Sequence, residues 1–358
     1  MKTERLNNII SKLKENDISQ MLICDPASIF YLTEKMISPG ERFLALLIKD
    51  NGDNKIFINS LFTVPEELGV EKVWFSDEQD ACEIACKYID RDKVLGIDKN
   101  LPARFLLRLM ELDSASGYKN TSDCVDTVRA CKDDEEIVLM REASRVNDEA
   151  MAVIKTRVRD GMTERELASQ LKDIYAQMGA YEYSFEPLVG FGKNAAVGHY
   201  EAGNTKLCEG DCVLIDMGCI KDGYCSDMTR TFFYKKVSDE HRKIYEIVLK
   251  AQKAAEAMIK PGVRFCDIDK TARDIITEAG YGDTFNHRLG HSIGIECHEY
   301  GDVSSVNENV VKEGMIFSIE PGIYIEGDMG VRIEDLVLVT KDGVEILNHY
   351  DKELQIID

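Results

Sequence analysis

The sequence predicts an α+β protein of two domains, a smaller α/β domain over residues 1–125 and a larger domain over residues 126–358. Three observations lead to this prediction. The chain has 358 residues, more than one hydrophobic core commonly holds. Its first part alternates short apolar strand patterns with amphipathic helix patterns. In the rest of the chain, the same order of helix, loop and paired strands occurs twice.

The smaller domain begins with a predicted surface helix, in which Leu6, Ile9 and Leu13 recur at helical spacing between charged residues. Strands are expected at 20–25, 43–48, 55–59, 72–75 and 94–98, and helices at 77–89 and 103–112. No set of chemically active residues stands out in this segment. We therefore expect the smaller domain to serve in packing and in shaping access of the substrate, and to contain no catalytic residues.

Composition and charge exclude several classes of protein. Hydrophobic residues make up 44% and charged residues 30% of the chain, as in ordinary globular proteins. The net charge of -21 argues against nucleic acid or an anionic membrane surface as the main partner. The N-terminus does not resemble a signal peptide, and no apolar run approaches the roughly 18 residues of a membrane span. Eleven cysteines without a CxxC pair favour reduced thiols and a cytoplasmic location.

The larger domain contains an internal repeat. Gly161 and Gly262 each end a predicted helix, are each followed by a second helix, and lie 101 residues apart. Offsets of 99 to 104 residues relate Gly179 to Gly280, His199 to His298, and Asp216 to Glu320. An offset this steady across helix, loop and strand predicts a duplicated domain whose two halves close on one site.

Each half contains a strand that ends in an acid. Residues 210–218 and 314–322 both read Gly, five residues, an acid, one residue, Gly. Asp227 and Glu334 then stand on the strands that follow. We expect strand 212–217 to pair with 226–233, and strand 315–320 to pair with 331–339. Strand alternation places Asp227, Thr229 and Thr231 on one face, and Arg332 on the same face as Glu334.

The apolar surroundings of these acids favour a metal site. A carboxylate buried in such a strand is costly unless it is paired or bound to a cation. Salt bridges to Arg230, Arg332 or Lys221 would account for one acid but not for four at equivalent positions. With one intervening imidazole, the predicted ligands of two metal ions are Asp216, Asp227, His291, Glu320 and Glu334.

The donor set also indicates the metal and the reaction. Four carboxylates and one imidazole form an oxygen-rich site without a thiolate, which suits Mn²⁺ best, with Co²⁺, Fe²⁺ or Zn²⁺ as alternatives. Two divalent ions lower the pKa of a water between them, which can then act as a nucleophile. The predicted reaction class is hydrolysis.

Three histidines, His287, His291 and His298, fall within twelve residues, and His291 directly follows a glycine. His291 is the predicted ligand. We expect His287, His298 and His199 to contact substrate or to move a proton. His241 and His349 lack such a context and are expected at the surface.

In this order, the five predicted ligands resemble those of the pita-bread metallopeptidases, the family of methionine aminopeptidase, aminopeptidase P and prolidase. The segments GHSIGIECHE, SIEPGIY and GVRIED carry the resemblance, which covers roughly residues 130–358. It implies a pseudo-two-fold pita-bread domain preceded by a creatinase-like α/β domain. A smaller N-terminal domain of this kind is typical of the Xaa-Pro peptidases of the family and not of methionine aminopeptidases.

The resemblance also implies roles for individual residues. Asp216 would hold one metal, Asp227 and Glu334 would bridge both, and His291 would bind the second with Glu320. Glu320 would also act as general base. His298 would contact the scissile carbonyl and His199 the substrate. His287 would line the pocket on the proline side, and Tyr324 and Arg332 would orient the ligands.

The expected activity is therefore hydrolysis of Xaa-Pro bonds in small peptides with proline at the second position, by a homodimer. The chain has Gly301 and Asp302 where many prolidases have Pro and then Arg, and Gly198 before His199 where Pro is common. Arg288 could replace the missing arginine in holding a dipeptide carboxylate. Dipeptidase and aminopeptidase P activities both stay open, with a metal-free creatinase-like hydrolase or a non-catalytic scaffold as alternatives.

Overall fold

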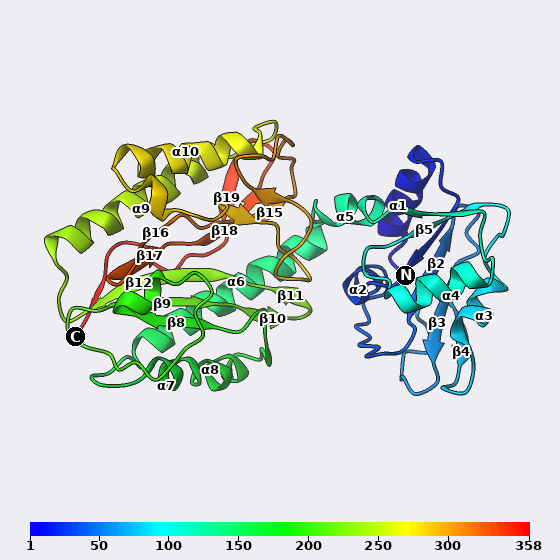
Figure 1. Ribbon diagram of the computed structural model, residues 1–358, viewed down its shortest axis with the longest axis horizontal. Helices are drawn as coiled ribbons and strands as arrows, with labels where there is room; N and C mark the ends of the chain where they lie inside the picture. Colours follow the sequence, from blue (N-terminus) through cyan, green and yellow to red (C-terminus); the bar gives the residue numbers. More distant parts are fainter. The chain divides into compact units, whose positions relative to one another are not determined.

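The computed structural model describes residues 1–358 and contains two compact units, residues 1–129 and residues 130–358 (Figure 1). The boundary expected at residue 125 falls inside helix α5 (Asp123–Arg129), whose last residue ends the first unit. No helix is both long enough and apolar enough to cross a membrane.

Unit 1 is an α/β domain built on one mixed six-stranded sheet in the order β4-β3-β2-β1-β5-β6. The strands are β1 (Gln20–Ile23), β2 (Ala45–Lys49), β3 (Lys55–Asn59), β4 (Glu71–Phe75), β5 (Val94–Ile97) and β6 (Gly117–Asn120). Besides α5, the helices are α1 (Thr3–Glu15), α2 (Pro26–Thr33), α3 (Ala81–Cys86) and α4 (Ala103–Glu111). The five predicted strands are confirmed within a few residues, and β6 is an additional strand at the sheet edge.

Helix α2 was not expected from the sequence, which predicted only a strand over 20–25 in this part of the chain. Pro26 occupies the first helical position, where its missing N–H costs nothing. The side chain of Asp25 accepts a hydrogen bond from the Ser28 N–H and caps the helix. The expected helix over 77–89 is shorter, because Asp80 caps it and it ends at Cys86.

Unit 2 contains the repeated plan. Its helices are α6 (Asp134–Lys155), α7 (Glu164–Ala168), α8 (Leu171–Gln177), α9 (Asp239–Ala257) and α10 (Phe265–Glu278), with 3-10 turns η1 (Gly192–Ala196) and η2 (Gly282–Thr284). Its longer strands are β8 (Leu188–Phe191), β9 (Cys212–Met217), β12 (Met228–Tyr234), β15 (Ile316–Ile319), β16 (Gly322–Ile325), β17 (Met329–Arg332) and β18 (Asp335–Val339). The shorter strands are β7 (Glu182–Tyr183), β10 (Cys219–Lys221), β11 (Tyr224–Cys225), β13 (Gly290–His291), β14 (Asp302–Val303), β19 (Val344–Ile346) and β20 (Ile356–Ile357).

The strands of unit 2 lie between two layers of helices, with α9 and α10 on one side and α6 to α8 on the other (Figure 1). Strand β9 shows how the sequence produces this arrangement. Val213 and Ile215 pack into the core with α6 to α8, whereas Leu214 packs into the core with α9 and α10. Because strand side chains alternate, Asp216 shares the face of Leu214, which is turned toward the second half of the domain.

Backbone contacts confirm the internal repeat. Gly161 and Gly262 both have positive φ, 68° and 90°, which favours glycine over any residue with a Cβ. Each donates its N–H to the strand entering the next hairpin, Gly161 to the Leu207 carbonyl and Gly262 to the Val311 carbonyl. The single helix expected after Gly161 is broken into α7 and α8.

Candidate active site

The first pair of predicted acids comes from an antiparallel hairpin. Strand β9 pairs with β12 so that Asp216 lies opposite Thr229, as the sequence predicted. Asp227 stands immediately before β12 and is buried. Asp227 also faces the second half of the domain. By strand alternation it lies on the same face as Phe233, which packs into the core with α9 and α10, as Leu214 does.

The second pair comes from β15 and β18, which pair with Ile319 opposite Asp335. Glu320 directly follows and Glu334 directly precedes this pair, so both stand just beyond the end of the ladder. The predicted pairing is confirmed for β18, but the strand expected over 331–339 is divided, and residues 331–332 belong to β17, which pairs with β16. The two hairpins face each other, since the Thr229 hydroxyl of β12 donates to Oε2 of Glu334 at 2.6 Å.

His291 approaches these acids from β13, a short strand that lies against β15. Gly290 makes the approach possible, because a Cβ at this position would lie 1.9 Å from the Ser318 carbonyl oxygen. Nδ1 of His291 is 3.3 Å from the Ser292 carbonyl, which only accepts hydrogen bonds, so Nδ1 carries a proton. Nε2 then points at Oδ2 of Asp227, 3.4 Å away, and at Oε1 of Glu320, 3.6 Å away. Against the effect of burial, these two carboxylates raise the pKa of His291.

The four carboxylates outnumber the cations around them. The guanidinium of Arg332 donates to Oδ2 of Asp216 at 2.5 Å. Burial, together with the charges of Asp227 and Glu320, raises the pKa of Asp216 to about 7 against the opposing effect of Arg332. Burial and the same acidic neighbours raise the pKa of Glu334 well above its usual range. Oδ1 of Asp216 and Oδ1 of Asp227 are buried without any hydrogen-bond partner.

These features fit a site for divalent cations. Buried carboxylate oxygens without partners are costly, and a lone pair on His291 Nε2 that faces two carboxylates repels them unless a proton or a metal cation lies between. Imidazole nitrogens and carboxylate oxygens that converge on one position are the usual ligands of Mn²⁺, Fe²⁺, Co²⁺ and Zn²⁺. Donor atoms of Asp227, His291 and Glu334 lie within 4.8 Å of one another.

A chain of hydrogen bonds leads from the acids to His287. Arg332 Nη1 donates to the Tyr324 hydroxyl at 3.1 Å, and that hydroxyl is 2.9 Å from His287 Nε2. His287 Nδ1 is 2.7 Å from the Arg288 carbonyl, so Nδ1 carries the proton and Nε2 accepts from Tyr324. Burial, and then the charge of Arg332, lower the pKa of His287 to about 4, so the ring is neutral at pH 7.

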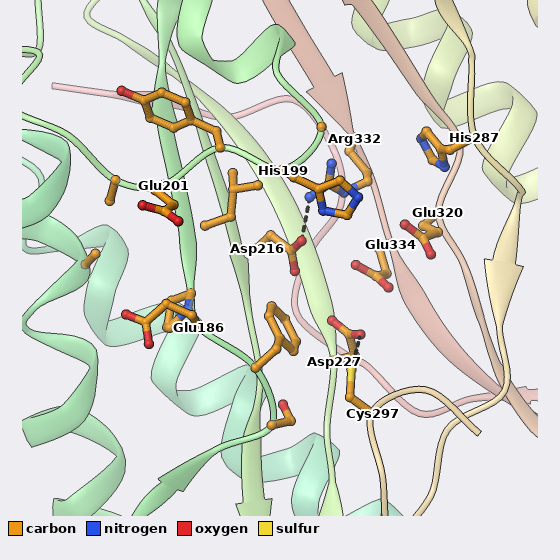
Figure 2. Close-up of a pocket in the computed structure, with 18 of the residues that line it drawn as sticks. Glu186, His199, Glu201, Asp216, Asp227, His287, Cys297, Glu320, Arg332 and Glu334 are labelled. Atoms are coloured by element: carbon orange, nitrogen blue, oxygen red, sulfur yellow. Dashed lines mark hydrogen bonds and ion pairs between the residues drawn. The ribbon is translucent and has the colours of Figure 1, made fainter. Parts of the chain in front are cut away.

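All predicted site residues line one pocket of about 1600 Å³ in unit 2. Figure 2 shows the four acids, Arg332 and His199 among the residues that line it. His199 and His298 are exposed in the pocket and are free to meet a ligand. Exposed acids, Glu186 and Glu201, line a separate part of the wall (Figure 2). The sequence did not single them out.

The loop that carries His199 is held by Glu164, which the sequence analysis missed. Glu164 is fully buried at the start of α7 and has no cationic partner. Its carboxylate instead accepts hydrogen bonds from the Phe191 N–H, the Asn194 amide, the Tyr200 hydroxyl and the Gly203 N–H. The sequence signal was weak, because an acid in the first turn of a helix is common for its effect on the helix dipole alone.

Cys297 is the other site residue that the sequence analysis missed. Its thiol lies 3.6 Å from Oδ2 of Asp227 (Figure 2). Three cysteines nearer to Asp216 in sequence point elsewhere: Cys212 contacts the Gly192 carbonyl, Cys225 the Ile295 carbonyl and Cys219 the Ser226 hydroxyl. The available signal was the position of Cys297 directly before His298.

The comparisons with known proteins show the family of the chain. Residues 138–341 match the model of metallopeptidase family M24, and residues 5–131 match the creatinase/prolidase N-terminal domain. The chain belongs to metallopeptidase family M24, with a creatinase-type N-terminal domain and a pita-bread domain. It is a peptidase, of a family that uses divalent metal ions.

Individual relatives cover nearly the whole chain. An uncharacterized peptidase of Staphylococcus saprophyticus is 39% identical over 97% of this chain and 100% of its own. The prolidase of Pyrococcus horikoshii is 33% identical, with a TM-score of 0.91 over 98% of this chain and 100% of its own. The Xaa-Pro dipeptidase of Bacillus anthracis is 31% identical, with a TM-score of 0.91 over 99% of both chains.

Proposed function

We propose that this peptidase hydrolyses Xaa-Pro bonds with two divalent metal ions bound by Asp216, Asp227, His291, Glu320 and Glu334. One observation carries the proposal. Both halves of the duplicated domain bring acids to one pocket, where four carboxylates face a single guanidinium and two buried carboxylate oxygens have no partner. Mn²⁺ suits this oxygen-rich set best, with Co²⁺, Fe²⁺ or Zn²⁺ as alternatives.

When bound, the ions would supply an activated water and a Lewis acid for the scissile carbonyl. Glu320 is the proposed general base, because its Oε1 reaches the pocket and receives a hydrogen bond from the Ser318 hydroxyl at 3.2 Å. Desolvation in the pocket and the neighbouring His291 lower the pKa of His298 to about 4. A neutral His298 can donate a hydrogen bond to the scissile carbonyl, and His199 can contact the substrate beside it.

The remaining residues would orient the substrate and the ligands. Arg332 fixes Asp216 directly, and through the Tyr324 hydroxyl it fixes the tautomer of His287. The His287 ring lies edge-on to Phe285, with centroids 4.9 Å apart, and this apolar contact suits a proline ring next to it. His287 is therefore the proposed contact for the proline side of the bond.

Dipeptides with proline in second position are the favoured substrates, because the solved relatives include a prolidase and an Xaa-Pro dipeptidase. Arg288 lines the pocket and could hold the dipeptide carboxylate in place of the arginine that Asp302 replaces. Aminopeptidase P activity on longer peptides is the alternative. A creatinase-like hydrolase or a scaffold would not need the five metal donors that this chain retains. The homodimer and the cytoplasmic location stay predictions.

The direct test is a metal-replacement assay. The purified protein is stripped of metal, Mn²⁺ or Co²⁺ is restored, and cleavage of Gly-Pro, Ala-Pro and a longer Xaa-Pro-Xaa peptide is measured. We expect metal-dependent cleavage of the dipeptides. Cleavage of the longer peptide alone would assign aminopeptidase P activity, and cleavage of none would refute the proposal.

A second assay tests the proposed role of Arg288. Arg288→Met should raise KM for Gly-Pro by about 10–100-fold, the cost of losing a hydrogen bond to a charged group. KM for a dipeptide amide, which lacks the carboxylate, should not change. Arg165→Met, which removes another arginine of the same pocket, is the matched control. An equal effect of both variants on both substrates would contradict the proposed role.

A further inference from the structure

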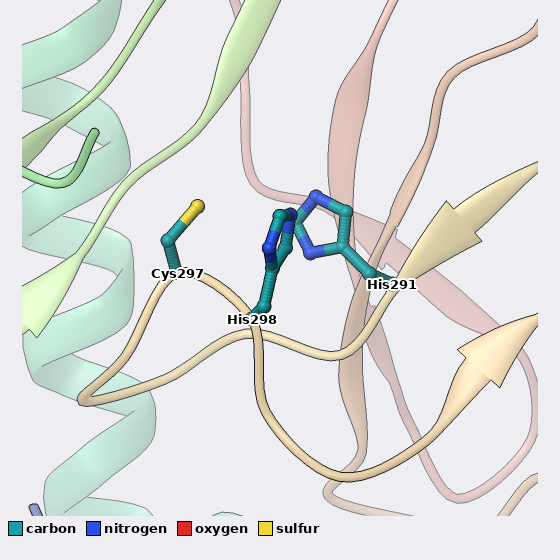
Figure 3. Close-up of side chains that lie close together, drawn as sticks. All are labelled: His291, Cys297 and His298. Carbon is teal, nitrogen blue, oxygen red and sulfur yellow. The ribbon is translucent and has the colours of Figure 1, made fainter. Parts of the chain in front are cut away.

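Three potential metal donors, His291, Cys297 and His298, form a second cluster at the edge of the acid site (Figure 3). Their donor atoms all lie within 4.8 Å of one another. The two imidazole rings meet edge to face, with centroids 4.2 Å apart. Only His291 belongs to the proposed carboxylate site, so Cys297 and His298 offer a sulfur and a nitrogen that this site does not use.

The loop that carries Cys297 and His298 is held in place by a buried acid. Oε1 of Glu299 accepts the N–H of Ile295 at 2.9 Å, and Oε2 is 3.1 Å from Nζ of Lys132. The Gly294 carbonyl accepts the N–H of Cys225 at 2.7 Å. The backbone that presents the donors is thus fixed before any ligand binds, which reduces the cost of binding.

A buried oxygen without a partner also belongs to this cluster. Asp227 is 3% exposed, and its Oδ1 has no hydrogen-bond partner. Its other oxygen, Oδ2, lies 3.4 Å from His291 Nε2 and 3.6 Å from the Cys297 thiol. A cation among these groups would therefore meet two imidazoles, one sulfur and one carboxylate.

This donor set differs in chemical character from the carboxylate site. Thiolate selects soft or borderline ions, whereas carboxylates suit Mn²⁺. Metal–sulfur and metal–nitrogen bonds of about 2.3 and about 2.1 Å place the donors of one tetrahedral ion about 3.6 Å apart. The cluster has to close by up to about 1 Å from its present 4.8 Å, which rotation of the Cys297 and His298 side chains can supply.

We propose that His291, Cys297 and His298, with Asp227 as fourth ligand, bind a thiophilic divalent ion such as Zn²⁺ or Cd²⁺. The thiol loses its proton to solvent as the metal–sulfur bond forms. Because His291 and Asp227 cannot serve both sites fully at once, the thiophilic ion competes with a catalytic ion. The competition with a catalytic ion rests on the proposed function. The binding of the thiophilic ion through Cys297 does not depend on it.

The test is titration of the metal-free, full-length protein with Cd²⁺, followed by the ultraviolet absorption of cadmium–thiolate charge transfer. We expect a band that is absent from Cys297→Ser and retained in Cys208→Ser, a matched control at an exposed cysteine. Cys297→Ser should weaken Cd²⁺ binding by at least about tenfold, since even loss of an outer ligand partner costs 10–100-fold. An unchanged band and affinity would overturn the proposal.

Two further measurements keep the result unambiguous. His298→Ala, at an exposed position, should also weaken Cd²⁺ binding by at least about tenfold, and unchanged binding would remove His298 from the set. Saturating Mn²⁺ should lower the apparent Cd²⁺ affinity, and no competition would overturn the sharing of His291. A Cys297-dependent band in a protein that cleaves no Xaa-Pro peptide would refute the proposed function and leave this site standing.

Discussion

Glu334 and Asp335 are neighbours in sequence and both are buried acids, but their surroundings are opposite. Glu334 faces the pocket, where it meets Asp216, Asp227 and Glu320, and burial with these charges raises its pKa. Asp335 faces the other side of the strand and lies 2.6 Å from both Arg230 and Lys352. Although burial opposes it, these two cations lower the pKa of Asp335.

The difference lies in the balance of charge on each face. On the inner face, Arg230 and Lys352 balance Asp335 and Glu256, so the cluster is complete within the protein. On the pocket face, four carboxylates meet Arg332 and one imidazole. A buried acid with its own cation supports the fold, whereas a surplus of buried acids marks a site that requires a cation from outside.

The largest expected effect is on catalysis. Glu320→Gln removes the proposed base and one negative donor, so kcat should fall by about 10²–10⁴-fold. The thermal midpoint of the metal-free protein should not fall, since the substitution removes a repelling charge. Steady-state kinetics with Mn²⁺ and circular dichroism melting measure both, with Glu326→Gln as an exposed control. Activity close to wild type would exclude Glu320 as the base.

The two neighbouring acids should respond oppositely to neutralisation. Asp335→Asn leaves the buried Arg230 without its ion pair and should destabilise the unit by about 3–5 kcal/mol. Glu334→Gln should raise the stability of the metal-free protein, because it relieves repulsion and keeps an oxygen for the Thr229 hydroxyl. Urea unfolding of the metal-free variants measures both. Destabilisation of similar size in both variants would contradict the contrast between the two faces.

Glu164 represents a third way to bury an acid, with hydrogen bonds instead of a cation. Glu164→Gln replaces an accepting oxygen with a donating amide, which should cost about 1–3 kcal/mol of stability. Loosening of the loop that carries His199 should raise KM more than it lowers kcat. Kinetics with Gly-Pro test this split, with exposed Glu209→Gln as the control. A fall in kcat at constant KM would contradict a positioning role.

The smallest expected effect concerns Asp25 in unit 1, which pairs with Arg129 at 3.1 Å. Against the effect of burial, Ser28 and Arg129 lower the pKa of Asp25. Its stabilisation is present above the unfolded pKa of about 3.9 and is lost as pH falls through the lower folded pKa. Asp25→Asn should lower the midpoint of unit 1 by about 3–5 °C at neutral pH. The deficit should shrink below about pH 4, and a deficit independent of pH would exclude this ion pair as its cause.

Much of the larger domain could be predicted because its signals are local. Strand alternation correctly paired β9 with β12 and β15 with β18, and the offset between Gly161 and Gly262 correctly indicated the repeat. Helix α2 and the break between α7 and α8 were missed. Both are short segments whose composition permits several conformations. Helix caps and tertiary packing decide which conformation each segment adopts.

The sequence by itself determined the family, the two domains and the set of acids, because spacing along strands fixes which face a side chain takes. Only the tertiary structure decided which buried acids are paired within the protein. In the sequence, Glu334 and Asp335 are two adjacent acids with nothing to tell them apart, and the position of Cys297 before His298 does not show that its thiol lies beside Asp227. Charge balance depends on residues more than 100 positions apart, as with Arg230 and Asp335, and only folding brings them together.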